Sequence, residues 1–154
     1  MAPDEATDRL AIRGLVDAYA HCADRRDAKG QMALFAHDAH FVVYYADAPA
    51  SEPELELGSR DELAAVFDDL NQYRATTHFN GQSTFEMGED WATGETYCLA
   101  HHIAGDGDMR TMFVASIRYE DTFAKADGTW LFAERKLHVD WTNTYPLGSG
   151  SDMR

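Results

Sequence analysis

The chain has 154 residues, of which 45% are hydrophobic and 26% charged, so its size and composition are those of one globular domain with a core and room for a small cavity. Its net charge of −14 argues against nucleic acid or an anionic membrane as a partner, because both would repel such a surface. No apolar stretch approaches the ~20 residues of a membrane span, and the acidic N-terminus is unlike a signal peptide.

The first half of the chain is predicted to be mostly helical. Apolar residues recur with a helical period over residues 8–23, and shorter helices are expected over 30–35 and 61–70. Between them, the segment HFVVYYA (40–46) is rich in β-branched and aromatic residues and predicts a strand. The proline-containing loop that follows has room for a short edge strand over 54–57.

The second half predicts long strands joined by turns. The expected strands cover 76–87, 91–103, 111–125 and 129–141, and Asp127-Gly128 is a hairpin turn between the last two. The polar segment 148–154 is expected to be a flexible tail. Helices followed by antiparallel strands indicate a single α+β domain over 1–147, in which a curved sheet folds over the first helix and encloses a pocket.

Strand alternation predicts which side chains face that pocket. In the strand 91–103, one face carries Thr96, Cys98, Ala100 and His102. Most of these side chains are small and leave space for a cavity, with His102 as one of its few polar groups. His78 shares its face with Thr76 and Asn80. In the last strand the mostly apolar face carries Leu131, Ala133, Arg135, Leu137, Val139 and Trp141.

His78 and Asp24 are the strongest candidates for chemistry. His78 lies in ATTHFNGQ (75–82), a stretch typical of a strand, where a histidine needs a polar partner or a function. Asp24 lies one residue beyond the apolar stripe of the first helix, where the helix reaches the mouth of the sheet. A carboxylate that binds one imidazole nitrogen leaves the other nitrogen to act as a base. The competing interpretations are a core histidine and a surface aspartate.

The order of elements resembles the nuclear transport factor 2-like fold, a conical scaffold with a curved, mainly antiparallel mixed sheet over N-terminal helices. Within it the chain resembles the SnoaL-like branch, which holds scytalone dehydratase, hexachlorocyclohexane dehydrochlorinase and bile acid 7α-dehydratase. The motif CADRRD has Asp24 where these enzymes carry a catalytic aspartate, and THFNG has His78 at their catalytic histidine. YEDTFAKADGTWLFAERKLHVDW followed by TYPL matches their closing hairpin.

The resemblance to scytalone dehydratase implies further catalytic candidates. Its second active-site histidine falls near His102, and a tyrosine that holds its substrate-polarising water falls near Tyr44. Both matches need a one-residue gap, so Tyr45 and His101 stay open as alternatives. A tyrosine that precedes the aspartate in the dehydratases is absent here, and Tyr19, one helical turn earlier, is a candidate replacement.

These observations predict a cofactor-independent lyase of the dehydratase type, in which His78 held by Asp24 abstracts a proton from a hydrophobic, ring-containing small molecule. An isomerase or polyketide-type cyclase could use the same base, and a non-catalytic ligand-binding or association module is the alternative outside enzymes. The predicted catalytic residues are His78, Asp24, His102 and Tyr44. The predicted pocket residues are Tyr19, Phe35, Val43, Asn80, Cys98, Ala100, Arg135, Leu137, Val139 and Trp141.

The expected partners and location follow from the remaining patterns. The neighbouring His101 and His102 would point to opposite faces of a strand and cannot share an ion, so we expect no metal and no cofactor. Cys22 and Cys98 are expected to be free thiols in a cytoplasmic protein. An outer sheet face with Trp130, Phe132 and His138 would predict a homodimer or homotrimer. Arg135 could instead pair with Glu95 or Glu120.

Overall fold

The computed structural model describes residues 3–49 and 51–148. Its elements in chain order are α1 (Pro3–Asp24), α2 (Ala28–Met32), β1 (Phe35–Tyr45), β2 (Leu55–Leu57), a 3-10 turn (Arg60–Glu62), α3 (Leu63–Asp68), a 3-10 turn (Asp69–Gln72), β3 (Ala75–Met87), β4 (Trp91–Ala104), a 3-10 turn (Gly107–Met109), β5 (Thr111–Ala126) and β6 (Thr129–Pro146). The expected flexible tail, 148–154, lies outside the described residues except for Gly148.

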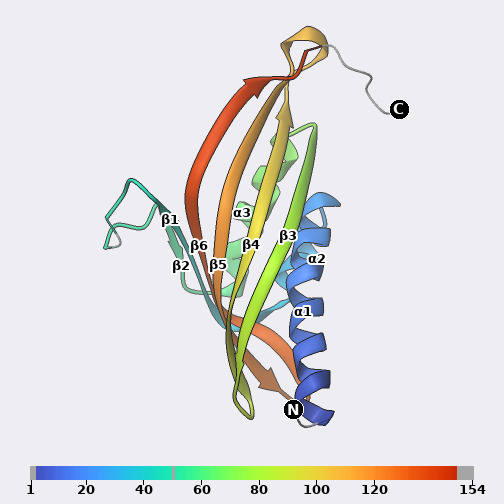
Figure 1. The fold of residues 1–154 in the computed structure, drawn as a ribbon, viewed down its shortest axis with the longest axis vertical. Coiled ribbons are helices and arrows are strands. Elements are labelled where there is room, and N and C mark those ends of the chain that lie inside the picture. The colour runs from blue at the N-terminus through green and yellow to red at the C-terminus, as the bar shows by residue number, and fades with distance from the viewer. Residues whose placement is uncertain (1–2, 50, 149–154) are drawn as a thin grey trace.

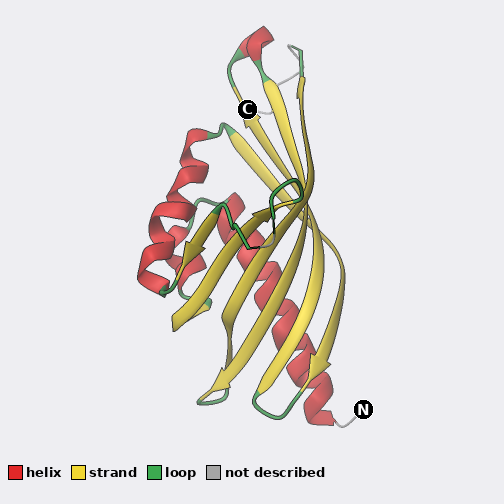
Figure 2. Ribbon diagram, turned by 90° about the vertical axis from the view of Figure 1, so that its left-hand side faces the viewer, coloured by secondary structure: helices red, strands yellow, loops and turns green. Residues whose placement is uncertain are grey.

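The six strands form one strongly curved sheet in the order β2-β1-β6-β5-β4-β3. Every neighbouring pair is antiparallel except β1 and β6, which run parallel. The helices cover one face of the sheet, with α1 running along β3, as Figures 1 and 2 show. The expected α+β architecture, with a mixed sheet wrapped over N-terminal helices, is confirmed.

The core lies between α1 and the concave face of the sheet. The buried side of α1 carries Ile12, Val16 and Tyr19, whose period matches the apolar stripe expected from the sequence. The Tyr19 ring makes edge contacts with Phe35 and Phe132 from two different strands. These aromatic contacts anchor the helix to the sheet, so the C-terminal end of α1 has a defined position relative to β3.

The turn between β5 and β6 forms as the sequence predicts. Asp127 and Gly128 have φ values of 51° and 78°, so both residues adopt the left-handed conformation that a two-residue hairpin turn requires. Aspartate tolerates this conformation and glycine adopts it freely.

Among the element boundaries that differ from the prediction, two differ because strand pairing extends beyond the β-rich sequence. The expected second helix, 30–35, ends at Met32, and Phe35 instead opens β1 by pairing with Phe132. The last strand continues past Trp141 to Pro146, because its end pairs with the first residues of β5. Neither partner strand is visible in the local pattern, so the local pattern underestimates both strands.

Two β-bulges in β6 correct the expected assignment of its faces. The pairing with β5 skips Ala133 and again skips Asp140, and each extra residue reverses the alternation of the strand. Phe132 therefore points into the core, fully buried, while Trp141 is 52% exposed. Leu131 is only partly buried. The inward set expected from strict alternation is thus correct only for the segment between the two bulges.

The bulge at Ala133 also contradicts the expected outer aromatic patch. Trp130 is buried, and its indole nitrogen donates a hydrogen bond to Asp8 of α1 over 2.8 Å, so this side chain points to the helices. Of the three residues that suggested a subunit interface, only His138 remains on the outer face.

Among the described helices, none is long and apolar enough to cross a membrane.

Candidate functional site

A cavity of about 190 Å³ opens between the end of α1, α3 and the concave face of the sheet. Its two imidazoles are His78 from β3 and His102 from β4, and its other polar groups include Gln31 and the phenol of Tyr45. The remaining wall is mainly apolar: Tyr19, Ala23, Phe41, Val43, Val66, Phe67, Leu70, Ala100, Phe113, Ala115, Ile117, Tyr119, Leu137 and Val139. The site is therefore a small apolar hollow with two imidazoles in its wall.

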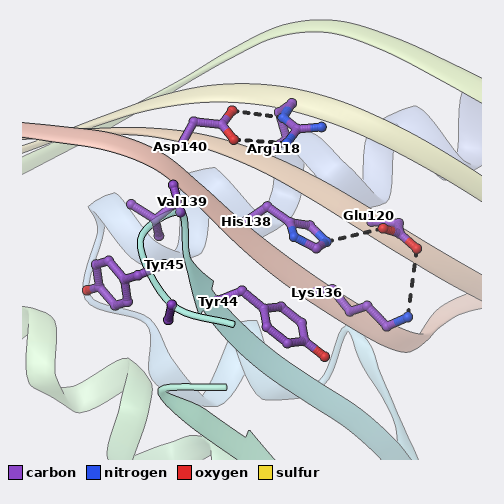
Figure 3. Close-up of a pocket in the computed structure, with 10 residues that line it drawn as sticks. Tyr44, Tyr45, Arg118, Glu120, Lys136, His138, Val139 and Asp140 are labelled. Atoms are coloured by element: carbon purple, nitrogen blue, oxygen red, sulfur yellow. Dashed lines mark hydrogen bonds and ion pairs between the residues drawn. The ribbon is translucent and has the colours of Figure 1, made fainter. Parts of the chain in front are cut away.

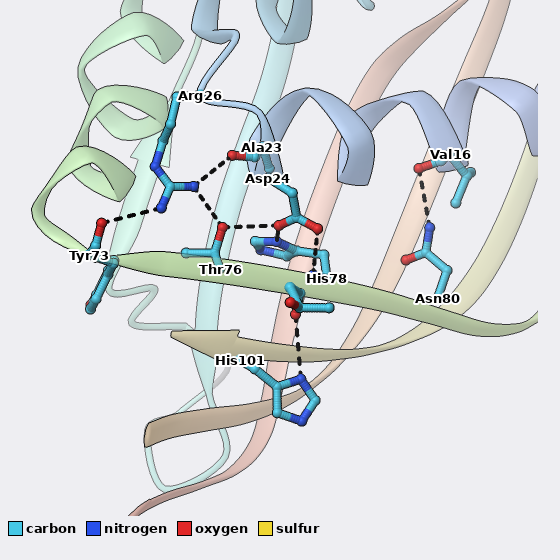
Figure 4. A network of polar contacts seen from close by, with 10 residues as sticks. Val16, Ala23, Asp24, Arg26, Tyr73, Thr76, His78, Asn80 and His101 are labelled. Carbon is cyan, nitrogen blue, oxygen red and sulfur yellow. Dashed lines mark hydrogen bonds and ion pairs between the residues drawn. The ribbon is translucent and has the colours of Figure 1, made fainter. Parts of the chain in front are cut away.

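His78 is held from behind by Asp24, the last residue of α1. Its Nδ1 lies 2.7 Å from Asp24 Oδ1, and its backbone N–H donates to Asp24 Oδ2 over 2.9 Å. The hydroxyl of Thr76 donates to Asp24 Oδ1 over 3.0 Å (Figure 4). Because a carboxylate accepts, Nδ1 carries the proton of the neutral ring, and Nε2 is left as an acceptor at the cavity wall.

Helix α1 and strand β3 supply this arrangement jointly. Burial by itself would raise the pKa of Asp24, but the hydrogen bonds from the His78 ring, the His78 backbone and Thr76 outweigh it and lower the pKa. Asp24 therefore stays ionised at neutral pH. Its negative charge at a helix C-terminus is unfavourable, and these three donors offset that cost.

His102 faces the same cavity, and its buried Nδ1 has no hydrogen-bond partner among the residues that the structure describes. Its ring lies edge-to-face with that of His78 at 5.6 Å between centroids, and Tyr73 covers its other side at 4.6 Å. Burial, followed by the nearby His78 and Arg26, lowers the pKa of His102 to about 4. His102 is therefore a neutral imidazole in the physiological range, with one nitrogen that donates a hydrogen bond and one that accepts.

Comparison with known families identifies the fold family. A model of the SnoaL-like domain matches residues 4–136. The chain belongs to the SnoaL-like family. This confirms the family resemblance stated from the sequence.

Solved structures share the fold of this SnoaL-like protein at low sequence identity. A putative scytalone dehydratase from Novosphingobium aromaticivorans is 23% identical, with a TM-score of 0.79, covering 99% of this chain and 100% of that one. A type 2 hexachlorocyclohexane dehydrochlorinase (LinA) is 16% identical, with a TM-score of 0.77, covering 98% and 95%. A putative aromatic ring hydroxylase, also from Novosphingobium aromaticivorans, is 21% identical, with a TM-score of 0.73, covering 95% of this chain and 96% of that one. A search among curated proteins found no match.

Half of the ten pocket residues expected from the sequence line the cavity of the SnoaL-like domain, namely Tyr19, Val43, Ala100, Leu137 and Val139. Strand β5 also contributes to the wall, which was not expected from the sequence: it supplies Phe113, Ala115, Ile117 and Tyr119. These four residues alternate along the strand, and the same period-2 pattern that identified Ala100 and His102 in β4 would have found them. Helix α3 adds Val66 and Phe67 to the wall.

Tyr44 lies on the opposite face of the sheet and cannot reach the cavity. Its ring stacks on His138 at 5.2 Å, in an outer hollow lined by ion pairs such as that of Arg118 with Asp140 (Figure 3). Tyr45, its neighbour and the open alternative, lines the cavity instead. Adjacent strand residues point to opposite faces of the sheet. A one-residue gap in the match to scytalone dehydratase therefore decides whether the matched tyrosine faces the outside, as Tyr44 does, or the cavity, as Tyr45 does.

By the same rule His101 lies on the outer side of β4, with its Nδ1 3.4 Å from the carbonyl of Thr77 (Figure 4). Of the two neighbouring histidines, His102 is therefore the one that faces the cavity.

Four other expected pocket residues also lie away from the cavity wall. Phe35 packs inside the aromatic core, stacked on Phe132. Asn80 turns towards α1 and donates to the carbonyl of Val16. Cys98 is buried behind the wall, where burial raises the pKa of its thiol to about 11. Trp141 is turned outward by the second bulge of β6, as described above.

Arg135 is fully buried but lies behind the cavity wall. Its guanidinium stacks on the rings of Tyr19 and Tyr119, at 4.2 and 3.7 Å from their centroids. Its ion-pair partner is Asp121, not the expected Glu95 or Glu120. Both tyrosines line the cavity, so Arg135 supports the wall from behind.

Among residues 3–49 and 51–148, no group of three or more histidine, cysteine, aspartate or glutamate side chains is arranged to hold a metal ion. Cys22 and Cys98 are free thiols.

Proposed function

We propose that this SnoaL-like protein is a lyase of the dehydratase type, in which His78 removes a proton from carbon next to a carbonyl group. The observation that carries the proposal is the 2.7 Å contact of His78 Nδ1 with Asp24, which leaves Nε2 as a base at the wall of an apolar cavity. An ionised carboxylate behind an imidazole fixes the tautomer and raises the basicity of the free nitrogen.

The elimination can be written with the groups that the cavity contains. His78 Nε2 takes the proton, and the C–H electron pair forms an enolate. The enolate then re-forms the carbonyl and expels hydroxide from the neighbouring carbon. His102 is neutral, so it would stabilise the enolate oxygen by a hydrogen bond rather than act as an acid. The imidazolium of His78 is then the acid that protonates the departing hydroxide, and the base is restored as water leaves.

The size of the cavity favours a small substrate. A dry apolar cavity of roughly 150 Å³ holds a benzene-sized ligand. The present cavity of about 190 Å³ therefore fits one six-membered ring with a few substituents, and a steroid would require it to widen considerably. The mainly apolar wall favours an uncharged ring, because a charged group would lose its hydration there without an opposite charge.

Isomerisation and cyclisation remain alternatives because they begin with the same proton abstraction, and they differ only in the fate of the enolate. A non-catalytic binding module is less well supported. In such a module the imidazole and the carboxylate have no reason to be paired with one nitrogen left towards a cavity. The three hydrogen bonds to Asp24 favour the catalytic alternative.

The proposal is tested with small cyclic ketones in D₂O. 3-Hydroxycyclohexanone reports elimination by the formation of 2-cyclohexenone and water, and 3-cyclohexenone reports isomerisation to the same enone without the loss of water. Deuterium uptake beside the carbonyl reports proton abstraction even where no product forms. We expect enzyme-dependent deuterium uptake and loss of water, both measured by mass spectrometry.

Variants then assign the base. His78→Ala should abolish deuterium uptake, and Asp24→Asn should lower it by roughly 10³- to 10⁴-fold, since an asparagine favours the wrong tautomer. His101→Ala is the matched control, because this histidine lies on the other face of β4. Uptake by His78→Ala equal to that of the unmodified protein would refute the base assignment.

A further inference from the structure

Arg26 adopts a backbone conformation that arginine rarely takes. It follows the end of α1 with φ of 59°, in the left-handed region, where most side chains clash with their own backbone. Glycine or asparagine would tolerate this position more easily. The conformation belongs to the end of α1, where the N–H of Arg26 donates to the carbonyl of Ala23 over 3.2 Å and the N–H of Asp27 to the carbonyl of Cys22 over 2.9 Å.

The side chain of Arg26 reaches across to β3. Its Nη1 donates to the hydroxyl of Thr76 over 2.7 Å and to the carbonyl of Ala23 over 3.0 Å, and its Nη2 donates to the carbonyl of Tyr73 over 3.4 Å. Figure 4 shows the guanidinium joining the end of α1 to the residues at the start of β3. The left-handed turn after α1 is what directs the side chain towards this position.

These contacts determine the direction of the Thr76 hydroxyl. A guanidinium has only donors, so the Thr76 oxygen must accept from Arg26. Its own proton is then free to point to Asp24 Oδ1, 3.0 Å away, the same oxygen that holds His78 Nδ1. Without Arg26, the hydroxyl could rotate and bind other acceptors, and Asp24 would lose a donor for part of the time.

We propose that Arg26 is a positioning residue for the His78–Asp24 pair, acting through the hydroxyl of Thr76. That this positioning serves catalysis rests on the proposed function. The hydrogen-bond relay from Arg26 through Thr76 to Asp24 exists independently of the reaction. The positive charge of Arg26 adds a second effect, because it disfavours a second positive charge on either cavity histidine.

Both effects predict the same change when Arg26 is removed. Asp24 becomes a stronger acceptor as it loses a donor, and the repulsion between Arg26 and a protonated His78 disappears. The other titratable groups near this pair include His102, His101 and Cys98 from β4, and Tyr73 beside the His102 ring. Removing Arg26 relieves the same repulsion at His102. The two rings are therefore followed separately, and we expect His78 to bind a proton more tightly.

The test is a pH titration of the His78 ring by ¹⁵N–¹H NMR, which reports both the tautomer and the protonation of the ring and needs no substrate. Arg26→Gly removes the side chain and leaves a residue that accepts the left-handed conformation, so folding should be kept. Arg26→Lys keeps the charge but not the forked set of donors. Arg25→Gln is the matched control, because it removes one positive charge from the exposed neighbouring position.

We expect Arg26→Gly to titrate at higher pH than the unmodified protein, Arg26→Lys to show a smaller shift, and Arg25→Gln to show almost none. Thr76→Val separates the hydrogen bond from the charge: it should shift the titration in the same direction by less than Arg26→Gly does. If Arg26→Gly fails to fold, Thr76→Val decides by the same measurement. An unchanged His78 titration in both Arg26→Gly and Thr76→Val would overturn the proposal.

These outcomes are separate from those of the proposed function. If the small ketones show no deuterium uptake but Arg26→Gly shifts the His78 titration, the positioning role stands and the proposed reaction fails. If uptake depends on His78 but its titration does not respond to Arg26 or Thr76, the reaction stands and Arg26 serves only to end the helix.

Discussion

Arg135 and Asp121 form a two-pronged ion pair in which both side chains are fully buried, at 2.8 and 2.9 Å. The pair joins β6 to β5 behind the tyrosines of the cavity wall. Removing one partner leaves an uncompensated charge in the interior, so Arg135→Met should lower the free energy of unfolding by about 3–5 kcal/mol, measured by urea denaturation. Arg118→Met is the control, because its pair with Asp140 is partly exposed and should cost about 1 kcal/mol or less.

The double variant Arg135→Met with Asp121→Leu should recover much of the loss, because it removes both charges together. Equal destabilisation by Arg135→Met and Arg118→Met would show that the buried charge is compensated by something other than its partner.

His102 makes the protein less stable at acid pH. In the unfolded chain its imidazole takes up a proton near the ordinary pKa of 6.5, whereas in the folded protein burial and nearby positive charge lower the pKa to about 4. Between these values the unfolded state binds more protons, so the free energy of unfolding falls as pH decreases, by up to about 1.4 kcal/mol per pH unit.

Urea denaturation at pH 7 and pH 5 measures this loss. His102→Asn should show a smaller decrease between the two pH values, while His101→Asn, altered on the other face of β4, should behave like the unmodified protein. If His102→Asn loses as much stability as the unmodified protein, other groups account for the acid sensitivity.

A larger side chain in the cavity wall should weaken the binding of a small ligand. Ala115 is buried in the cavity wall, and Ala115→Leu would place three more carbon atoms in a space of about 190 Å³. We expect the binding of cyclohexanone, followed by NMR line shifts of the His78 ring, to weaken at least roughly tenfold, because the ligand and the leucine would compete for the same space. Thr77→Leu adds the same side chain on the exposed outer face and should leave binding unchanged.

Self-association stays a prediction, but the residues that could support it differ from those first named. Phe79, Leu99 and Trp141 are 68%, 40% and 52% exposed. They lie in one row across the outer face, with Ser116 between the last two. If the chain is a homodimer or homotrimer that buries this row, Phe79→Asp should lower the mass measured by light scattering, whereas Leu10→Asp on the exposed side of α1 should not. A monomeric mass for the unmodified protein would end this prediction.

The local sequence pattern predicted the helix stripe of α1, the hairpin at Asp127-Gly128 and the inward face of β4. Each of these depends on residues that are neighbours along the chain. The pairing of His78 with Asp24 came from the resemblance to the SnoaL-like family, together with the need of a strand histidine for a polar partner. The structure agrees in bringing their side chains to hydrogen-bonding distance.

The tertiary structure decided the features that depend on two distant segments. The bulges at Ala133 and Asp140 arise from how β6 pairs with β5, and they turned Phe132 inward and Trp141 outward against the expected alternation. The reach of Arg26 to Thr76 depends on how the end of α1 packs on β3, fifty residues later in the chain. A period-2 pattern carries no information about an inserted residue in the pairing or about a contact across the core, because both are set by the partner segment rather than by the neighbours of the residue itself.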